Sequence, residues 1–217
     1  MYCKFKIVLI IGICTLLFSC VEKDKNYIER AKTKVVVNER PKTGDINDES
    51  ISWSTKYNKK KSFRGWKYIV IHHSATDSGN AAAFHKYHTD KGYGGLAYHF
   101  VIGNGKGCKD GKVEVGFRWK KQITGTHCSV RAWEYNIYGI GICLVGNFSV
   151  KRPTKKQMKA LYKLVLRLMK ENDIQISNIV GHKEVVWDSD KEKTEQTSCP
   201  GKLFDMNAFR KNLRKQF

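Results

Sequence analysis

The chain has 217 residues, and its 40 Lys and Arg against 20 Asp and Glu give a formal net charge of +20. This length suits one domain of ordinary size with an attached tail, or two very small domains. A hydrophobic content of 41 %, with ten Phe, ten Tyr and five Trp, is enough for a core and excludes wholesale disorder. The positive charge indicates anionic surroundings or partners, namely nucleic acid, lipid head groups or an acidic polymer.

The first 20 residues are predicted to be a lipoprotein-type signal peptide. Lys4 and Lys6 precede an apolar run over residues 7–18, which is too short to span a membrane and has the length of a signal-peptide core. Ser19 followed by Cys20 resembles the bacterial lipoprotein box, in which the cysteine receives lipid. We therefore expect an exported protein, anchored in a membrane through a lipidated Cys20 and facing the periplasm or cell wall. An ordinary cleaved signal or an uncleaved anchor is the alternative.

Two segments of different composition follow the signal peptide. Residues 21–64 are polar and lack a sustained apolar period, which predicts a flexible tether. Residues 65–217 hold 26 basic and 13 acidic residues and are expected to form the one folded domain. The positive charge therefore belongs to the folded part as well.

The predicted elements of the folded part mix strands and helices without strict alternation. β-branched and apolar runs predict strands, and helical spacing with capping residues predicts helices. The pattern indicates an α/β (α+β) fold with a central mixed β-sheet of about five strands flanked by helices. In chain order we expect a strand at 68–73, a helix at 80–90, strands at 97–102, 113–119 and 138–145, a helix from 154, a strand at 176–180 and a helix at 205–214.

The helix that begins after Thr154 has the strongest pattern. Thr154 and Gln157 form a capping box after Pro153. Apolar side chains then recur at helical spacing with Lys and Arg between them, which predicts a core-facing stripe. The apolar positions are Met158, Leu161, Leu164, Val165, Leu168 and Met169.

Three groups of residues are candidates for metal ligands. His72 or His73 ends the first predicted strand, His182 follows the fifth, and Cys199 lies in the loop beyond. Two imidazoles and one thiolate suit Zn²⁺ and leave a fourth position for water. Because strand neighbours point to opposite faces, only one of His72 and His73 can face the metal. A histidine in an apolar strand is more often a packed core residue than a metal ligand.

Five short motifs follow one another in a fixed order along the folded part. They are IHHSAT (71–76), AYHFVI (97–102), YGIGICLVGNF (138–148), VGH (180–182) and SCPG (198–201). With these motifs the sequence resembles the zinc-dependent N-acetylmuramoyl-L-alanine amidases, a family that includes phage lysozyme-type amidases and animal peptidoglycan recognition proteins. The resemblance covers about residues 65–205.

The resemblance implies roles for individual residues. It selects His72, His182 and Cys199 as the zinc ligands and leaves His73 packed or supporting. It implies that Tyr98 stabilises the oxyanion of a tetrahedral intermediate, with Thr197 as a weaker helper. It places His127 near the substrate groove, where either substrate contact or a structural role is open. Some bacterial relatives carry a Glu where this chain has Cys143, so a carboxylate base is missing there.

The other charged and titratable residues are expected to be structural or solvated. We expect His85 and His88 to lie on a solvated helix face, and Glu134, Glu184 and Asp188 to be surface charges. The charged segment between His182 and Cys199 is longer than is usual in the family. Disulfide pairing among the remaining cysteines, Cys108, Cys128 and Cys143, is open.

The resemblance implies zinc-dependent hydrolysis of the amide bond between N-acetylmuramic acid and L-alanine in peptidoglycan. The expected partners are a peptidoglycan or muropeptide substrate and the membrane that holds Cys20, and a monomer is expected. The alternative is a non-catalytic module that binds peptidoglycan or muropeptides through the same groove. Nucleic-acid binding is not expected, because none of the common reading motifs is present.

Overall fold

The computed structural model describes residues 65–216. The predicted signal peptide, Cys20 and the predicted tether lie outside the described residues. Within the described part of the chain, no helix has both the length and the hydropathy required to cross a bilayer.

A five-stranded mixed sheet forms the centre of the fold, as predicted. Its strands follow the order β3-β2-β4-β1-β5. β3 is antiparallel to its neighbour β2, and the other neighbouring strands pair in parallel. The strands are β1 (Tyr68–His73), β2 (Phe100–Ile102), β3 (Val113–Val115), β4 (Gly139–Leu144) and β5 (Ile179–Gly181).

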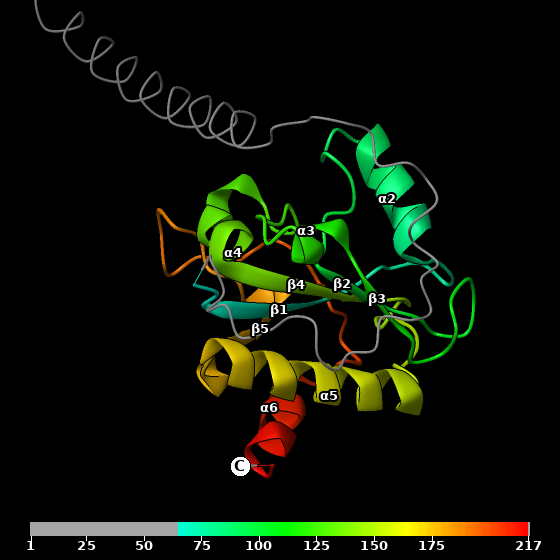
Figure 1. The fold of residues 1–217 in the computed structure, drawn as a ribbon. Coiled ribbons are helices and arrows are strands. Elements are labelled where there is room, and N and C mark those ends of the chain that lie inside the picture. Colours follow the sequence, from blue (N-terminus) through cyan, green and yellow to red (C-terminus); the bar gives the residue numbers. More distant parts are fainter. Residues whose placement is uncertain (1–64, 217) are drawn as a thin grey trace, which may run out of the picture. The chain divides into compact units, whose positions relative to one another are not determined.

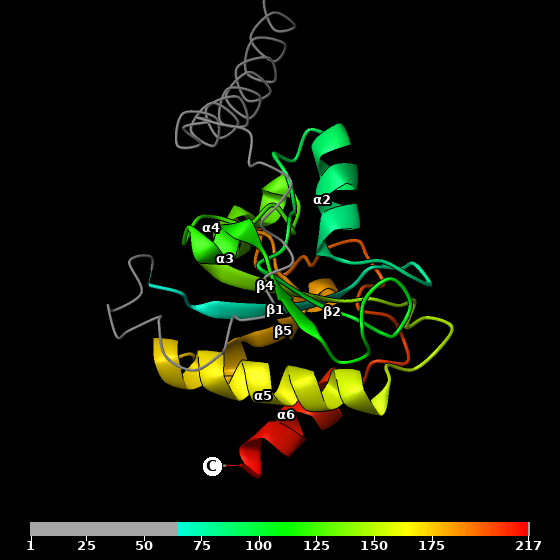
Figure 2. The same cartoon turned by 45° about the vertical axis from the view of Figure 1, so that its right-hand side comes forward.

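Helices cover both faces of the sheet. The α-helices are α2 (Ala81–Asp90), α3 (Phe117–Lys120), α4 (Trp133–Tyr138), α5 (Lys155–Asn172) and α6 (Met206–Arg214). Short 3₁₀ turns are η1 (Val130–Ala132), η2 (Ile176–Asn178) and η3 (His182–Glu184). α5 covers one face of the sheet with α6 beneath it, whereas α3 and α4 lie on the opposite face, with α2 on that side as well (Figures 1 and 2).

The alternation of β1 assigns its residues to these two faces. Ile69 and Ile71 belong to the main hydrophobic core, which also contains the apolar stripe of α5. Val70 packs in a separate cluster with Tyr135 of α4. Because successive strand residues alternate, His72 shares the α4 face with Val70, and His73 shares the α5 face.

The helix cap predicted at Thr154 is present, and two further helices have side-chain caps. The Thr154 hydroxyl accepts a hydrogen bond from the backbone N–H of Gln157, and the side-chain oxygen of Gln157 accepts one from Thr154 N, which completes the capping box. Asn80 caps α2 and Asp205 caps α6 in the same side-chain manner. These local signals therefore locate the helix starts correctly.

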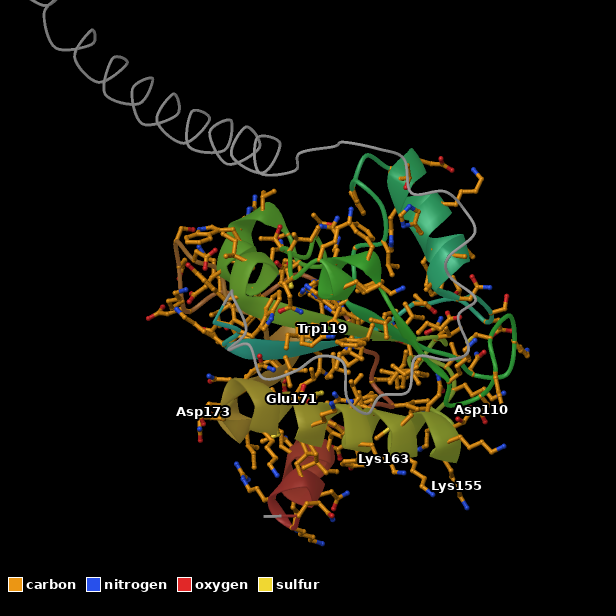
Figure 3. The ribbon with its side chains drawn as sticks, in the orientation of Figure 1. Asp110, Trp119, Lys155, Lys163, Glu171 and Asp173 are labelled. Atoms are coloured by element: carbon orange, nitrogen blue, oxygen red, sulfur yellow. The ribbon has the colours of Figure 1, made fainter. Side chains whose placement is uncertain are left out.

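Several predicted strands are shorter than expected. The strand predicted at 97–102 begins at Phe100, and the strand predicted at 113–119 ends at Val115. Trp119, labelled in Figure 3, lies in α3 and packs its ring 4.9 Å from that of Phe100. The prediction for Trp119 was wrong because an aromatic residue near the end of a strand pattern also suits a helix that covers the sheet. α4 was not predicted.

Candidate metal centre

Strand register places His72 and His182 side by side. β1 and β5 are adjacent and parallel, and Ile71 lies opposite Gly181. His72 follows Ile71 on β1, and His182 follows Gly181 directly after the end of β5, so both lie at the carboxyl end of the sheet, with their rings 4.5 Å apart between centroids. Open parallel sheets commonly bind ligands at this edge.

Cys199 reaches the same place from the loop that follows η3. Its sulfur lies 3.7 Å from Nδ1 of His72 and accepts a hydrogen bond of 3.3 Å from the backbone N–H of His73. The carbonyl of Cys199 accepts a 2.7 Å hydrogen bond from Lys183 N, which ties the loop to η3. A Cβ at Gly181 would crowd Pro200, so a glycine there lets the loop approach the strand end.

The residues present fit a zinc ion. One donor atom from each of His72, His182 and Cys199 can be chosen so that all three lie within 4.8 Å of one another. His72 is 1 % exposed and Cys199 is 8 % exposed. Nε2 of His182 is buried with no hydrogen-bond partner in the described part of the chain, a costly state that a ligand would relieve. Two nitrogens and one sulfur suit Zn²⁺ with an open position.

The electrostatics of these groups match the protonation states that ligands require. Burial, with the neighbouring His182 and His127, holds the pKa of His72 well below its usual value, so the ring is neutral. Burial also lowers the pKa of His182. Burial raises the pKa of the Cys199 thiol to about 12, so the thiolate requires a cation beside it.

A second donor set shares His72, but its spacing indicates hydrogen bonding. His72, His127 and Cys128 also place donor atoms within 4.8 Å of one another. Nε2 of His72 lies only 3.1 Å from Nδ1 of His127, a direct hydrogen-bond distance. The 3.7 Å from Cys199 Sγ to His72 Nδ1 leaves more room for an ion between the atoms. The first set is therefore the better metal site.

A chain of hydrogen bonds can set the tautomer of His72. Nε2 of His127 lies 3.3 Å from the carbonyl oxygen of Gly139, which can only accept. With its proton on that atom, His127 presents the Nδ1 lone pair to Nε2–H of His72. His72 then keeps the lone pair on Nδ1, the atom that faces Cys199. Metal-bound histidines are commonly oriented by such partners.

His127 is held rigidly in this position. Asn136 Oδ1 accepts hydrogen bonds from His127 N at 2.8 Å and from Cys128 N at 2.9 Å. A Cβ at either Gly125 or Gly141 would collide with the His127 ring, so these glycines make room for it. His127 is only 6 % exposed. The geometry therefore favours the structural role that the sequence left open over substrate contact.

Tyr98 lies beside His72. Its ring is 5.1 Å from the His72 ring between centroids. Burial raises its pKa well above the usual value, and the neighbouring Cys143 and Cys199 act in the same direction. Tyr98 therefore remains a neutral phenol that can donate a hydrogen bond.

The expectation that His85 and His88 lie on a solvated face was wrong. His88 is 8 % exposed, and its Nδ1 accepts a 3.2 Å hydrogen bond from Ala97 N. Nδ1 of His85 accepts one of 3.3 Å from Leu96 N. Both histidines turn inward because they satisfy backbone donors of the irregular segment before Tyr98, and they help to position that segment.

Arg118 is a positioning residue that sequence reasoning missed. It is 3 % exposed, and its guanidinium donates to the carbonyls of Leu96, Thr124 and Tyr93 at 2.6–2.7 Å. These bonds join the two loops that lead to Tyr98 and His127. No sequence signal distinguished Arg118 from the many other basic residues.

Thr197 has a clear local role in the structure. Its Oγ1 accepts a 3.1 Å hydrogen bond from the backbone N–H of Cys199, two residues later. This bond shapes the turn that carries Cys199. The predicted contribution of Thr197 to catalysis stays a prediction.

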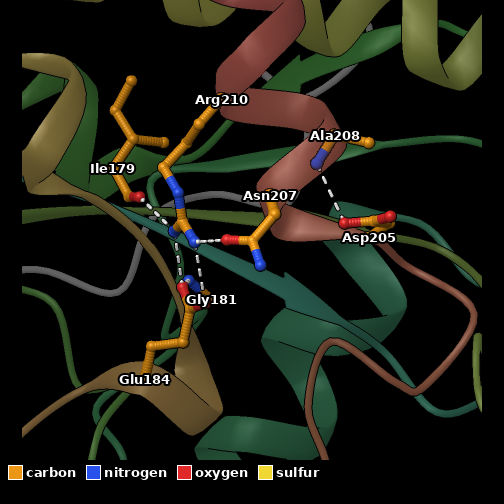
Figure 4. A network of polar contacts seen from close by, with 7 residues as sticks. All are labelled: Ile179, Gly181, Glu184, Asp205, Asn207, Ala208 and Arg210. Atoms are coloured by element: carbon orange, nitrogen blue, oxygen red, sulfur yellow. Dashed lines mark hydrogen bonds and ion pairs between the residues drawn. The ribbon is translucent and has the colours of Figure 1, made fainter.

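Glu184 supports the strand end next to His182 and is not a free surface charge. Its carboxylate accepts two hydrogen bonds from Arg210 of α6, at 2.7 and 3.0 Å, and one of 2.8 Å from Gly181 N (Figure 4). Arg210 also donates to the carbonyl of Ile179 at 3.0 Å. The expectation for Glu184 was wrong because α6, distant in sequence, covers this end of β5.

The segment between His182 and Cys199 is folded onto the site face. Val186 and Thr194 form an antiparallel bridge, which makes a small hairpin. Glu195 accepts hydrogen bonds from both N and Oγ of Ser129, at 3.0 and 2.6 Å. Asp188 accepts one of 3.1 Å from Glu134 N, the start of α4. Glu134 and Asp188 therefore help to join this hairpin to α4.

The four cysteines of the described residues are free thiols. Cys143 lies on β4 opposite His72 in the register. Burial, followed by Cys199, raises the pKa of its thiol well above the usual value, and a hydrogen bond with Tyr98 opposes this shift. A neutral thiol thus occupies the place of the carboxylate that some relatives are expected to carry.

Comparisons with known proteins point to one family. A family model described as N-acetylmuramoyl-L-alanine amidase matches residues 62–202. Peptidoglycan-recognition protein 1 of Holotrichia diomphalia is 32 % identical over 107 residues, which cover 45 % of this chain and 49 % of that protein. The chain spans about half the length of this relative.

Solved structures show the same fold. An N-acetylmuramoyl-L-alanine amidase of Clostridium intestinale matches with a TM-score of 0.55 and 26 % identity, over 71 % of this chain and 88 % of that one. The bumblebee protein PGRP-SA matches with a TM-score of 0.50 and 25 % identity, over 69 % and 81 % of the two chains. The architecture expected from the sequence is therefore confirmed.

Proposed function

This chain belongs to the N-acetylmuramoyl-L-alanine amidase family, and from that membership we propose that it hydrolyses the amide bond between N-acetylmuramic acid and L-alanine in peptidoglycan. The observation that carries the proposal is the convergence of His72, His182 and Cys199 at one strand edge. A module that only binds its ligand has no need for a buried thiol with two neutral imidazoles.

The residues around this edge have separable tasks. His72, His182 and Cys199 would hold zinc, with His127 fixing the tautomer of His72. When bound, zinc supplies a Lewis acid that polarises the scissile carbonyl and lowers the pKa of water toward about 7. Tyr98, kept neutral by burial, donates a hydrogen bond to the oxygen that gains negative charge as the carbonyl is attacked. Thr197 positions Cys199.

The second candidate is binding of peptidoglycan without hydrolysis. It is favoured by the similarity to proteins whose names state peptidoglycan recognition. The two candidates differ in what Tyr98 contributes. Loss of the Tyr98 hydroxyl slows hydrolysis, whereas a binding module depends on it only as one contact among many.

Hydrolysis of purified peptidoglycan by single variants tests the proposal. Tyr98→Phe is expected to retain zinc and to lower kcat by about 100-fold, the effect of losing one oxyanion donor. Cys199→Ala is expected to lose zinc, as measured by metal analysis, and all activity. Tyr93→Phe, at an exposed tyrosine, is the matched control and should behave like the parent chain. If the parent chain and both site variants release peptides from peptidoglycan at the same rate, the proposal is contradicted.

A further inference from the structure

The outer side of α5 carries a strip of positive charge. At about 100° per residue, its six basic residues fall within an arc of about 120° on the helix surface. The apolar stripe lies on the opposite side, against the sheet. Five of the six are exposed lysines, and the strip from the first to the last is about 22 Å long. The basic residues of this strip, called the lysine strip below, are Lys155, Lys156, Lys159, Lys163, Arg167 and Lys170.

The lysine strip is of a single sign. The one acidic residue in α5, Glu171, pairs with Arg167 at 2.6 Å. None of the five lysines forms an ion pair with any described residue. Lys155, Lys159 and Lys163 stand four residues apart, an arrangement in which like charges destabilise a helix. A helix face that only contacts water has no need for lysines that repel one another. The lysine spacing therefore points to an anionic partner that offsets this repulsion.

The lysine strip lies on the opposite side of the sheet from the candidate metal centre. His72 faces α4, whereas α5 covers the other face. The labelled Lys155 and Lys163 point away from the sheet (Figure 3). α6 packs against α5 through Tyr162 and Phe209, whose rings lie 4.7 Å apart. α6 and the residue after it add further exposed basic residues, Lys211, Arg214 and Lys215. A partner held here would leave the site open.

We propose that the lysine strip is a docking surface for an anionic phospholipid bilayer. Lysines act as hydrated point charges and suit attraction to a broad charged surface, whereas specific phosphate grips favour the fork of arginine. Exposed aromatic side chains that stack on single-stranded nucleic acid are absent from α5, since the exposed Tyr87, Tyr93 and Trp133 lie elsewhere in the described part of the chain. The proposal is independent of the proposed hydrolysis.

Vesicle sedimentation of the full chain tests this docking. Each basic residue near an anionic bilayer contributes about fivefold to partitioning, so Lys155→Gln, Lys159→Gln and Lys163→Gln together should weaken binding by about 100-fold. The vesicles are phosphatidylglycerol mixed with phosphatidylcholine at about 0.1 M salt, and pure phosphatidylcholine gives the baseline from the rest of the chain. Glutamine has a helix propensity close to that of lysine, so the midpoint of thermal unfolding of the triple variant should not be lower than that of the parent chain.

A matched triple variant separates a local surface from general charge. Lys86→Gln, Lys91→Gln and Lys120→Gln remove the same charge from exposed positions on α2, at its end and on α3. This triple is expected to lower partitioning by less than about fivefold, and about 0.5 M salt should abolish the difference between the two triples. Equal losses in the two triples would overturn the proposal. The proposal would also be overturned if the parent chain bound duplex DNA through the lysine strip but bound anionic vesicles no better than pure phosphatidylcholine vesicles.

Discussion

Replacing His127 with leucine removes the hydrogen-bond acceptor of His72 and fills the space over Gly141 with an apolar side chain. The Nε2–H of His72 then has no partner in a buried place, at a cost of about 1–3 kcal/mol. The proton can avoid this only by moving to Nδ1, where it blocks the lone pair that faces Cys199. Either outcome weakens zinc binding, by about 10–100-fold.

The matched variant is His127→Asn. The Oδ1 atom of asparagine lies about where Nδ1 of histidine lies, so it can still accept from His72. We therefore expect zinc affinity near that of the parent chain, whatever the packing cost of the smaller side chain. The pair of variants separates the acceptor at position 127 from the volume of the ring, which both replacements change.

Competition with a chromophoric chelator at pH 7.5 measures zinc affinity without reference to activity. Cobalt substitution adds a second readout, because its visible absorption bands report the coordination geometry. Thermal unfolding of the metal-free chains controls for loss of the fold. If leucine and asparagine weaken zinc binding equally, or if neither does, then His127 does not act through the tautomer of His72.

Three further outcomes follow from the contacts around the site. A double-mutant cycle of Glu184→Gln and Arg210→Met, measured by urea unfolding, should give a coupling energy of about 1–2 kcal/mol. The reason is that the pair is bidentate and its side chains are only 30 % and 17 % exposed. If the effects of the two single variants simply add, this prediction is contradicted. Burial, then Arg118 and His85, lower the pKa of His88, so the unfolded chain takes up a proton below pH about 6.5 that the folded chain resists, and the free energy of unfolding falls as the pH falls from 7 to 5. His88→Asn keeps an acceptor for Ala97 N and should make this pH dependence shallower; an unchanged slope would refute the assignment. Glu195→Ala should release the hairpin from Ser129 and speed limited proteolysis within residues 186–194, whereas Glu192→Ala, at an exposed side chain, should leave the cleavage rate unchanged.

Local patterns in the sequence determined the parts of the fold that depend on near neighbours. The capping box at Thr154 and the apolar stripe after it correctly predicted α5, because a helix start needs only residues within one turn. Alternation along 68–73 correctly separated His72 from His73, since the faces of a strand follow from its own period. His73 indeed packs on the other face, where its Nδ1 accepts from Phe148 N at 3.0 Å.

The surroundings of the candidate site were decided by contacts between distant segments. Glu184 was expected at the surface, but Arg210 arrives from α6 and half-buries it. His88 was expected in solvent, but its ring turns inward to accept a hydrogen bond from the backbone N–H of Ala97. The local sequence around Glu184 does not indicate Arg210 as a partner, and the local sequence around His88 does not indicate Ala97.

The sequence by itself determined which residue types are available and which face of a strand each occupies. Only the tertiary structure decided that Ile71 pairs with Gly181, and this register brings two histidines 110 positions apart into ring contact. Register depends on the packing of whole elements against one another, and a shift of one residue would turn His182 to the other face. The hydrogen bond from His72 to His127 likewise exists only because the folded chain places Gly125 and Gly141 where an imidazole ring needs space.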